Sequence, residues 1–92
     1  MTVRYDARAL KDIEAIREYI ARYDPIAAGR VVSRIERAIQ RLGVLPLSAR
    51  PGRVPGTRVL AVPELPYVVI HRVRGDSVDI IAVLHTARGR RS

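Results

Sequence analysis

The sequence contains no cysteine, which excludes disulfide bonds and thiolate metal sites. It has only two histidines, so a structural zinc site is not expected either. No apolar run approaches the ~18 residues that a membrane-spanning helix requires, and the N-terminus has no signal-peptide core. We therefore expect a cytoplasmic protein that uses no metal ion or other cofactor.

Acidic residues are scarce beside basic ones, 9 against 17, and the net charge is +8. Lysine is scarce as well, since Lys11 is the only one and every other basic residue is arginine. A genome rich in G and C would account for the choice of arginine but not for the excess of positive charge. Such an excess favours a polyanion or an acidic protein as the partner.

The length of 92 residues allows a single domain, which we place over the whole chain, 1–92. A chain of this size buries somewhat more than ~60% of the surface that it exposes when unfolded, so its core is adequate but small. Residues 86–92 include Arg88, Arg90 and Arg91 and are expected to form a flexible basic tail.

The segment from Pro66 to His85 predicts a β-hairpin, because β-branched residues fill both arms and Gly75-Asp76 lies between them. A glycine at the first position of a two-residue connection favours a type II′ turn. The predicted cross-strand pairs are Arg74–Ser77, Val73–Val78, Arg72–Asp79, His71–Ile80, Ile70–Ile81, Val69–Ala82, Val68–Val83 and Tyr67–Leu84. Both faces of this hairpin are largely apolar, so each of them needs a cover.

Two helices are predicted before the hairpin. Asp6 is the expected N-cap of the first helix, which extends from Ala7 to Tyr23. Its apolar stripe consists of Leu10, Ile13, Ile16, Ile20 and Tyr23. Asp24-Pro25 ends this helix and begins the next, and Gly43 is its expected left-handed C-cap. The stripe of the second helix consists of Ala28, Val31, Val32, Ile35, Ala38, Ile39 and Leu42.

Four arginines follow the side of the second helix opposite its apolar stripe. They are Arg30, Arg34, Arg37 and Arg41. Their spacing places them in one row on a helix surface. This basic row is either a solvated surface or a binding surface, and the sequence leaves both interpretations open.

The pattern of a short strand occurs at Thr2–Tyr5 and again at Thr57–Val62. Residues 44–56 hold three of the six prolines and are expected to form a long ordered connection. The element order is therefore β-α-α-β-β-β. We predict an α+β domain in which the N-terminal helical hairpin packs on one face of an antiparallel four-stranded sheet. The first strand is expected to lie beside the last.

Six segments, taken in order, carry a resemblance to a known family. They are Tyr19-Ile20, Asp24-Pro25-Ile26-Ala27-Ala28, Arg50-Pro51-Gly52, Gly56–Leu60, Tyr67–Val73 and Ile81–Arg88. With this order and spacing the chain resembles, over nearly its whole length, the RelE/ParE superfamily of toxins from bacterial type II toxin–antitoxin systems.

The resemblance implies a toxin that a cognate antitoxin, ParD-like or similar, holds in a hetero-oligomer. RelE-like members cut messenger RNA in the ribosomal A site, whereas ParE-like members poison DNA gyrase and have no known hydrolytic site. The helical-hairpin signature and the ending Leu84–Arg88 are more similar to ParE-type sequences. The prediction is therefore a ParE-like gyrase inhibitor that is not an enzyme. The alternatives are a RelE-like, ribosome-dependent endonuclease and a non-toxic basic binding module.

A RelE-like activity would require a base and a cation on the phosphate. His85 is the candidate base, because an ordinary imidazole titrates near ~6.5. Arg58 matches the phosphate-contacting arginine of the family and is the candidate clamp, although it is equally suited to tie the proline-rich loop to the sheet. Arg50, Arg53 and Arg88 are further candidates for binding the target or its phosphates. A convincing acid is missing, since no tyrosine follows His85.

The hairpin face turned away from the helices is the candidate antitoxin-binding surface. The predicted register places Val68, Ile70, Ile81 and Val83 on this face, where they would form a contiguous apolar patch. An antitoxin that covered the patch and carried acidic residues would also offset the net charge. His71 is predicted on the opposite, helix-facing side, as a hydrogen-bonded core residue.

Overall fold

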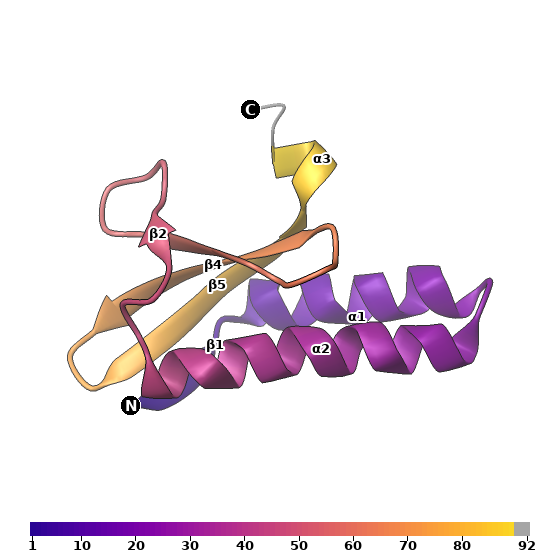
Figure 1. The fold of residues 1–92 in the computed structure, drawn as a ribbon, viewed down its shortest axis with the longest axis horizontal. Coiled ribbons are helices and arrows are strands. Elements are labelled where there is room, and N and C mark those ends of the chain that lie inside the picture. Colours follow the sequence, from indigo (N-terminus) through magenta and orange to yellow (C-terminus); the bar gives the residue numbers. More distant parts are fainter. Residues whose placement is uncertain (90–92) are drawn as a thin grey trace.

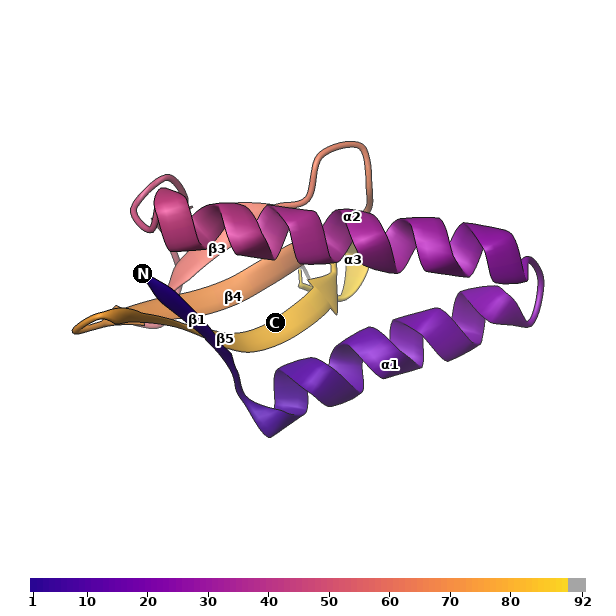
Figure 2. The ribbon, with the colours of Figure 1, turned by 90° about the horizontal axis from the view of Figure 1, so that it is seen from below.

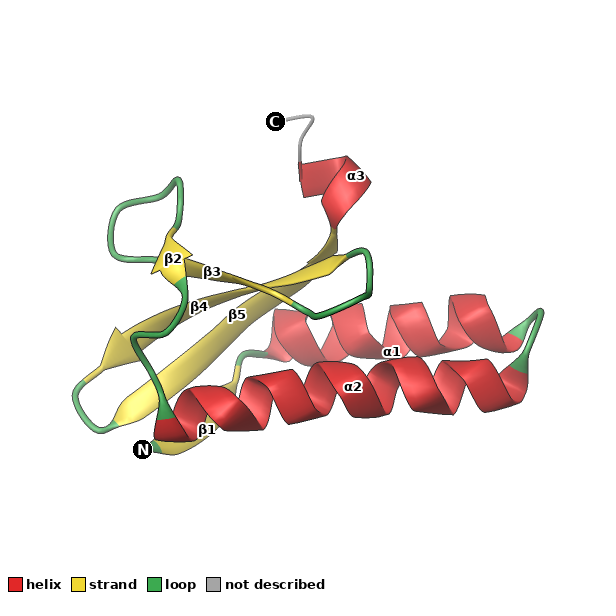
Figure 3. Ribbon diagram, in the orientation of Figure 1, coloured by secondary structure: helices red, strands yellow, loops and turns green. Residues whose placement is uncertain are grey.

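The computed structural model describes residues 1–89 and has two layers (Figures 1 and 3). Its elements are β1 (Thr2–Tyr5), α1 (Ala7–Ala21), α2 (Pro25–Val44), β2 (Arg50–Pro51), β3 (Arg58–Ala61), β4 (Tyr67–Arg74), β5 (Ser77–His85) and α3 (Thr86–Gly89). The strands form one sheet in the order β1-β5-β4-β3-β2. Figure 2 shows α1 and α2 crossing this sheet on the side away from α3.

The α+β architecture and the position of the first strand beside the last are confirmed, but two details of the predicted sheet are wrong. The sheet has five strands, because Arg50-Pro51 inside the predicted connection pairs with β3. It is also mixed, because β1 is parallel to β5. The N-terminal amino group donates to the carbonyl of Gly43 at 2.6 Å, so α2 ends beside the start of β1. Because β4 is antiparallel to both β3 and β5, the chain reverses its direction twice between β3 and β5. The last strand, β5, then runs in the same direction as β1.

The second helix has the clearest amphipathic pattern and supplies most of the helical part of the core. The side chain of its N-cap, Asp24, accepts a hydrogen bond from the backbone N–H of Ala27 at 3.1 Å. Its buried residues are Ala28, Val32, Ile35, Ala38, Ile39 and Leu42, as the spacing predicts. In α1 only Ala9 and Ile13 are buried, whereas Leu10 is 54% exposed and Tyr23, beyond the end of the helix, is 77% exposed. The predicted stripe of α1 is therefore wrong at these two positions.

Gly43 is not the C-cap of α2, which continues through Val44. A Cβ atom on Gly43 would lie 3.0 Å from the carbonyl oxygen of Met1 and 3.2 Å from Cγ2 of Val3. The glycine thus serves a close approach between the helix and β1 rather than a left-handed turn.

The register of the hairpin agrees with the prediction near the turn and departs from it farther along. Gly75 has φ +53°, as the first position of such a turn requires, and the four pairs from Arg74–Ser77 to His71–Ile80 are confirmed. The next pair is Ile70–Ala82, so Ile81 is an extra residue in a β-bulge. The pairs beyond it are Val69–Val83, Val68–Leu84 and Tyr67–His85.

The bulge changes which residues of β5 face the helices. Val83 pairs with Val69 and is 3% exposed within the main core, so its predicted place on the outer face is wrong. Leu84 moves instead to the outer face, opposite Val68. A one-residue shift has this effect because neighbouring side chains of a strand point to opposite faces.

Asp12 of α1 holds the bulged part of β5. Its Oδ2 atom accepts a hydrogen bond from the backbone N–H of Val83 at 2.9 Å. The ladder between β1 and β5 ends at the pair Tyr5–Ile80, so this N–H lies on an edge of β5 that no strand covers. The carboxylate of Asp12 therefore provides the acceptor that a neighbouring strand would otherwise supply.

The two faces of the sheet differ in their cover. Along β4 the residues alternate, with Tyr67, Val69 and His71 buried and Val68 and Ile70 partly exposed. We call the helix-covered side the inner face and the other side the outer face. In Figure 1, α3 and the loop between β2 and β3 rise on the outer side of the sheet.

The predicted basic tail falls partly within a helical turn. Thr86–Gly89 form α3 directly after β5, and the backbone N–H of Thr86 donates to the carbonyl of Pro66 at 2.8 Å. Residues 90–92, with two of the three predicted tail arginines, lie outside the described residues. No helix in the described part of the chain is both long and apolar enough to cross a membrane.

Candidate functional site

Arg58 lies at the start of β3, on the inner face, opposite His71 of β4. Its Nη1 atom donates a hydrogen bond to the carbonyl of Ala49 at 2.8 Å. This bond ties the proline-rich connection to the sheet, so the structural role considered for Arg58 is present. This contact uses only one of the N–H groups of the guanidinium, which is able to donate several hydrogen bonds.

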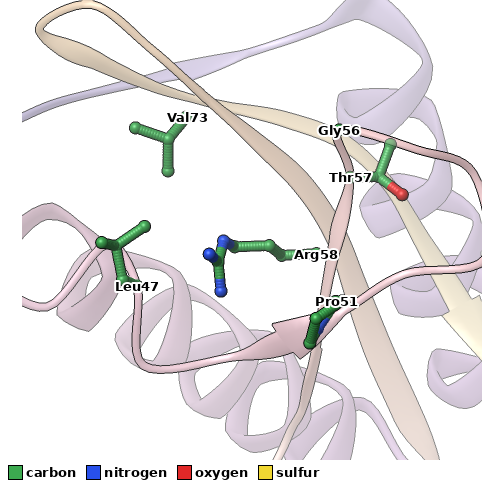
Figure 4. A pocket seen from close by; sticks show the side chains of 6 residues that line it. All are labelled: Leu47, Pro51, Gly56, Thr57, Arg58 and Val73. Carbon is green, nitrogen blue, oxygen red and sulfur yellow. The ribbon is translucent and has the colours of Figure 1, made fainter.

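A shallow cavity of about 320 Å³ adjoins Arg58 at the end of the sheet. Its lining consists of Leu47, Pro51, Gly56, Thr57, Arg58 and Val73, and Figure 4 shows Arg58 reaching from β3 toward Leu47. Gly52 keeps the neighbouring loop tight, because a Cβ atom there would collide with the hydroxyl of Thr57. The cavity combines one cation with apolar walls, which suits a single anionic group rather than a long polyanion.

The other candidate arginines are not gathered around this cavity. Arg50 pairs with Val59, the neighbour of Arg58, so its side chain lies on the outer face. Arg53 is exposed in the loop between β2 and β3. The backbone of Arg88 lies in α3, beyond the far end of β5, and its side chain is outside the described part of the structure.

His85 is the last residue of β5 and lies on the inner face, opposite Tyr67. The two rings meet edge to face, with centroids 5.5 Å apart and planes at 87°. Nδ1 of His85 accepts a hydrogen bond from the backbone N–H of Ala87 at 3.1 Å. A neutral imidazole has one donor and one acceptor nitrogen, so this bond places the proton on Nε2.

The two candidate catalytic residues are far apart. Arg58 pairs with His71 and His85 pairs with Tyr67, four residues farther along β4. Four residues of a strand span ~13 Å, whereas a base and a phosphate clamp must reach the same few atoms. Tyr67 is buried in the core and is not placed to act as the missing acid.

His71, the cross-strand partner of Arg58, is completely buried. Its Nδ1 atom lies 3.4 Å from the carbonyl oxygen of Val69, and its Nε2 atom has no hydrogen-bond partner among the described residues. Burial lowers the pKa of the His71 imidazole below its usual 6.5, its bond to Val69 opposes this, and the charge of Arg58 lowers it further. The expected core role is confirmed, and the side chain remains neutral.

The outer face carries an apolar surface that differs in part from the predicted one. Val68 and Ile70 are partly exposed there, and Ile81 is partly exposed at the bulge. We define the outer apolar surface as Val59, Val68, Ile70, Ile81 and Leu84, which are all partly exposed. The sequence did not predict Val59 and Leu84 on this surface, because only the observed strand register shows that they pair with Ile70 and Val68. No signal in the apolar run Ile80–Leu84 marks the bulge.

The described part of the chain contains no group of side chains that could bind a metal ion. Within it, no three side chains of histidine, cysteine, aspartate or glutamate lie close enough together to hold a metal ion. His85 lies opposite Tyr67, four residues along β4 from His71, and no aspartate or glutamate lines the cavity beside Arg58.

Known proteins match the chain in sequence and in fold. A family described as the ParE toxin of the type II toxin–antitoxin system parDE matches residues 3–89. A putative toxin, Y4kP, from Sinorhizobium fredii is 42% identical over 90% of this chain and 85% of the relative. The toxin RelE2 of Caulobacter vibrioides is 36% identical over 88% of this chain and 90% of its own length.

A solved structure shows the same fold. A chain from the chromosomal ParDE toxin–antitoxin system of P. aeruginosa superposes with a TM-score of 0.83 and 26% sequence identity. The match covers 92% of this chain and 95% of the other. The agreement therefore extends over both layers.

Proposed function

Because the chain belongs to the ParE toxin family of type II toxin–antitoxin systems, we propose that it stops growth by inhibiting DNA gyrase. A cognate antitoxin binds it and keeps it inactive in the cytoplasm, where the proposed target acts. The observation that carries the choice of target is the separation of His85 from Arg58 along β4. A toxin that acts by binding gyrase needs no assembled hydrolytic site.

The test is a supercoiling assay with purified gyrase. The chain is expected to inhibit supercoiling, and His85→Ala is expected to retain inhibition. Cleavage of translated messages at codons, lost in His85→Ala, would favour the ribosome-dependent endonuclease instead. Growth that continues when the chain is expressed without its antitoxin would favour the non-toxic binding module.

The arginines supply the groups that a gyrase-binding role would use. Arg50 and Arg53 are exposed near the loop between β2 and β3, and Arg58 lines the adjoining cavity. Arg88 follows β5. We expect Arg58→Ala to reduce inhibition more than His85→Ala, because Arg58 also holds the connection through Ala49. Equal inhibition by both variants would contradict this ranking.

The outer apolar surface is the proposed antitoxin-binding site. Its side chains are only partly covered by the chain itself, and such patches mark interfaces. Ile70→Asp or Ile81→Asp should weaken the complex, because a carboxylate would then be buried without a partner. Leu10→Asp is the matched control, since Leu10 is an exposed apolar residue on α1. Equal affinities of the Ile70 variant and the control for the antitoxin, measured by calorimetry, would refute the placement.

A further inference from the structure

The outward side of α2 carries a row of four arginines that the proposed function leaves unused. We name Arg30, Arg34, Arg37 and Arg41 the arginine ridge. All four are exposed. With 3.6 residues per turn they fall within an arc of roughly 60°, and with a rise of ~1.5 Å per residue they span ~16 Å.

Acidic side chains neutralise almost none of the positive charge of the ridge. Within residues 1–89, Arg30, Arg37 and Arg41 form no ion pair, and Arg34 is 3.5 Å from Glu64, whose side chain is 81% exposed. Such an exposed pair contributes little. The ridge arginines are each other's neighbours at spacings of three and four residues, which is a repulsive arrangement on a helix.

The first helix shows what an ordinary solvated helix surface looks like in this chain. Arg8 is 3.5 Å from Asp12, and Arg17 is 3.4 Å from Glu14. Basic residues of α1 thus have acidic residues three or four positions away, whereas no acidic residue lies three or four positions from any ridge arginine. A row of arginines without acidic neighbours, beside a helix that carries ion pairs, indicates that the ridge has a ligand.

The surroundings of the ridge indicate the class of ligand. A cavity of about 260 Å³ between α2 and the turn after β3 brings three of the ridge arginines around one depression, and Glu64 is the one acidic residue of its lining, which consists of Arg34, Arg37, Ala38, Arg41, Val62, Pro63 and Glu64. No large apolar side chain is exposed between Ile26 and Val44, at the two ends of the helix. A protein interface needs apolar or aromatic anchors at its centre, whereas phosphate contacts need only cations.

We propose that the arginine ridge binds the phosphodiester backbone of a nucleic acid. Guanidinium groups bind phosphate oxygens in a bidentate manner, so a row of arginines suits this contact. One strand of duplex DNA carries a phosphate every ~3.4 Å along the helix axis, so a ridge of ~16 Å reaches up to four or five of them. The contact is independent of base sequence and does not depend on gyrase being the target.

The experiment measures binding of the purified chain to a fluorescent 20-base-pair duplex by anisotropy over a range of salt concentrations. The double variant Arg37→Gln/Arg41→Gln removes two ridge charges. Lys11→Gln/Arg22→Gln is the matched control, because it removes two exposed charges from α1, or from the turn after it, that form no ion pair within residues 1–89. Both variants therefore have the same net charge.

Each phosphate contact contributes ~0.9 to the slope of log K against log salt for duplex DNA. The ridge variant should therefore lose ~1.8 from this slope and bind roughly 60-fold more weakly at 0.1 M salt, whereas the control should retain the original slope. Equal losses in the two variants would overturn the proposal, because net charge alone would then explain binding.

Thermal denaturation gives a second test. Since the substitutions relieve the repulsion between neighbouring arginines, the ridge variant should melt no lower than the parent chain. A lower melting temperature would show that the ridge stabilises the fold, and would also count against the proposal.

Two further measurements identify which class of polyanion the ridge binds. Single-stranded DNA and duplex RNA of equal length share the backbone chemistry, and the preferred ligand is the one whose binding the ridge variant loses most. Poly-glutamate with the same number of charges tests an acidic protein segment. If it displaced the duplex at equal charge concentration, the ridge would be a site for an acidic protein and the proposal would be wrong.

Discussion

The inner and outer faces of the sheet contain similar side chains but differ in what covers them. On the inner face Val69, Val78 and Ile80 are completely buried against α1 and α2. On the outer face Val68 and Ile70 of the same hairpin are only partly buried, and no helix of the hairpin α1–α2 reaches them. The fold of this small chain is thus held mainly by the inner face, while the outer face stays partly open to solvent.

This comparison also explains the position of the polar groups. The inner face contains one completely buried ionisable residue, His71, whereas Arg50 and Arg72 lie on the outer face. Burial keeps the imidazole neutral, while solvent on the outer side accepts full charges. A partner that covers the outer face must therefore match both apolar side chains and positive charge.

The largest effect is expected from truncating the inner face. Ile80→Ala should lower the free energy of unfolding by about 2–5 kcal/mol, because a completely buried side chain leaves a cavity. Ile70→Ala removes the same atoms from the outer face and should cost clearly less. Urea denaturation of the two variants checks the difference. Equal losses would mean that the outer face is as important for folding as the inner one.

A smaller loss is expected from Asp12, whose carboxylate accepts the hydrogen bond from Val83 beside the bulge of β5. Asp12→Ala leaves the buried N–H of Val83 without its acceptor and should cost about 1–3 kcal/mol. Asp12→Asn retains an acceptor oxygen and should recover part of this loss. If both variants are as stable as the parent chain by thermal denaturation, the hydrogen bond is not needed to hold the bulge.

The third prediction concerns pH and tests whether the inner face stays neutral. Because burial lowers the pKa of His71, the unfolded chain takes up a proton near pH 6.5 that the folded chain does not. Stability should therefore fall as the pH decreases from 7.5 to 5.5. In His71→Leu this part of the decrease should disappear from urea midpoints measured at the two pH values. An unchanged pH dependence would show that His71 is not its source.

The smallest effect is expected at Glu64, outside both faces, in the turn between β3 and β4. Glu64 has φ +65°, a conformation that costs an L-residue about 1–2 kcal/mol and glycine much less. Glycine loses more entropy on folding, by about 0.5–1 kcal/mol, so Glu64→Gly should stabilise the chain by roughly 0.5–1 kcal/mol. Calorimetric melting checks this. A destabilised variant would mean that the contact with Arg34 is stronger than its exposure suggests.

Local patterns were sufficient to predict the elements and much of the core. The apolar period of α2, its start at Asp24-Pro25 and the turn at Gly75 are properties of neighbouring residues, and all are confirmed. The antitoxin-binding and target-binding residues remain predictions. Of the candidate site, the placement of Val68 and Ile70 on the outer face was correct, while that of Val83 was not.

The remaining features depend on contacts between distant segments. The run Ile80–Leu84 is apolar throughout, so no alternation of polar and apolar residues reveals the bulge at Ile81. Gly43 has the sequence of a C-cap, yet β1 passes against it and the helix continues. The helix–strand contact at Gly43 and the carboxylate of Asp12 at Val83 each join residues more than forty positions apart.

The sequence by itself determined the α+β class, the helical hairpin, the two-residue turn and the excess of positive charge, because each depends on residue type and on spacing along the chain. Only the tertiary structure decided that β1 is parallel to β5, that Val83 belongs to the core and that His85 and Arg58 lie four residues apart along β4. The physical reason is that strand pairing and register depend on backbone groups, which are alike at every residue, so their partners are selected by packing across the whole molecule.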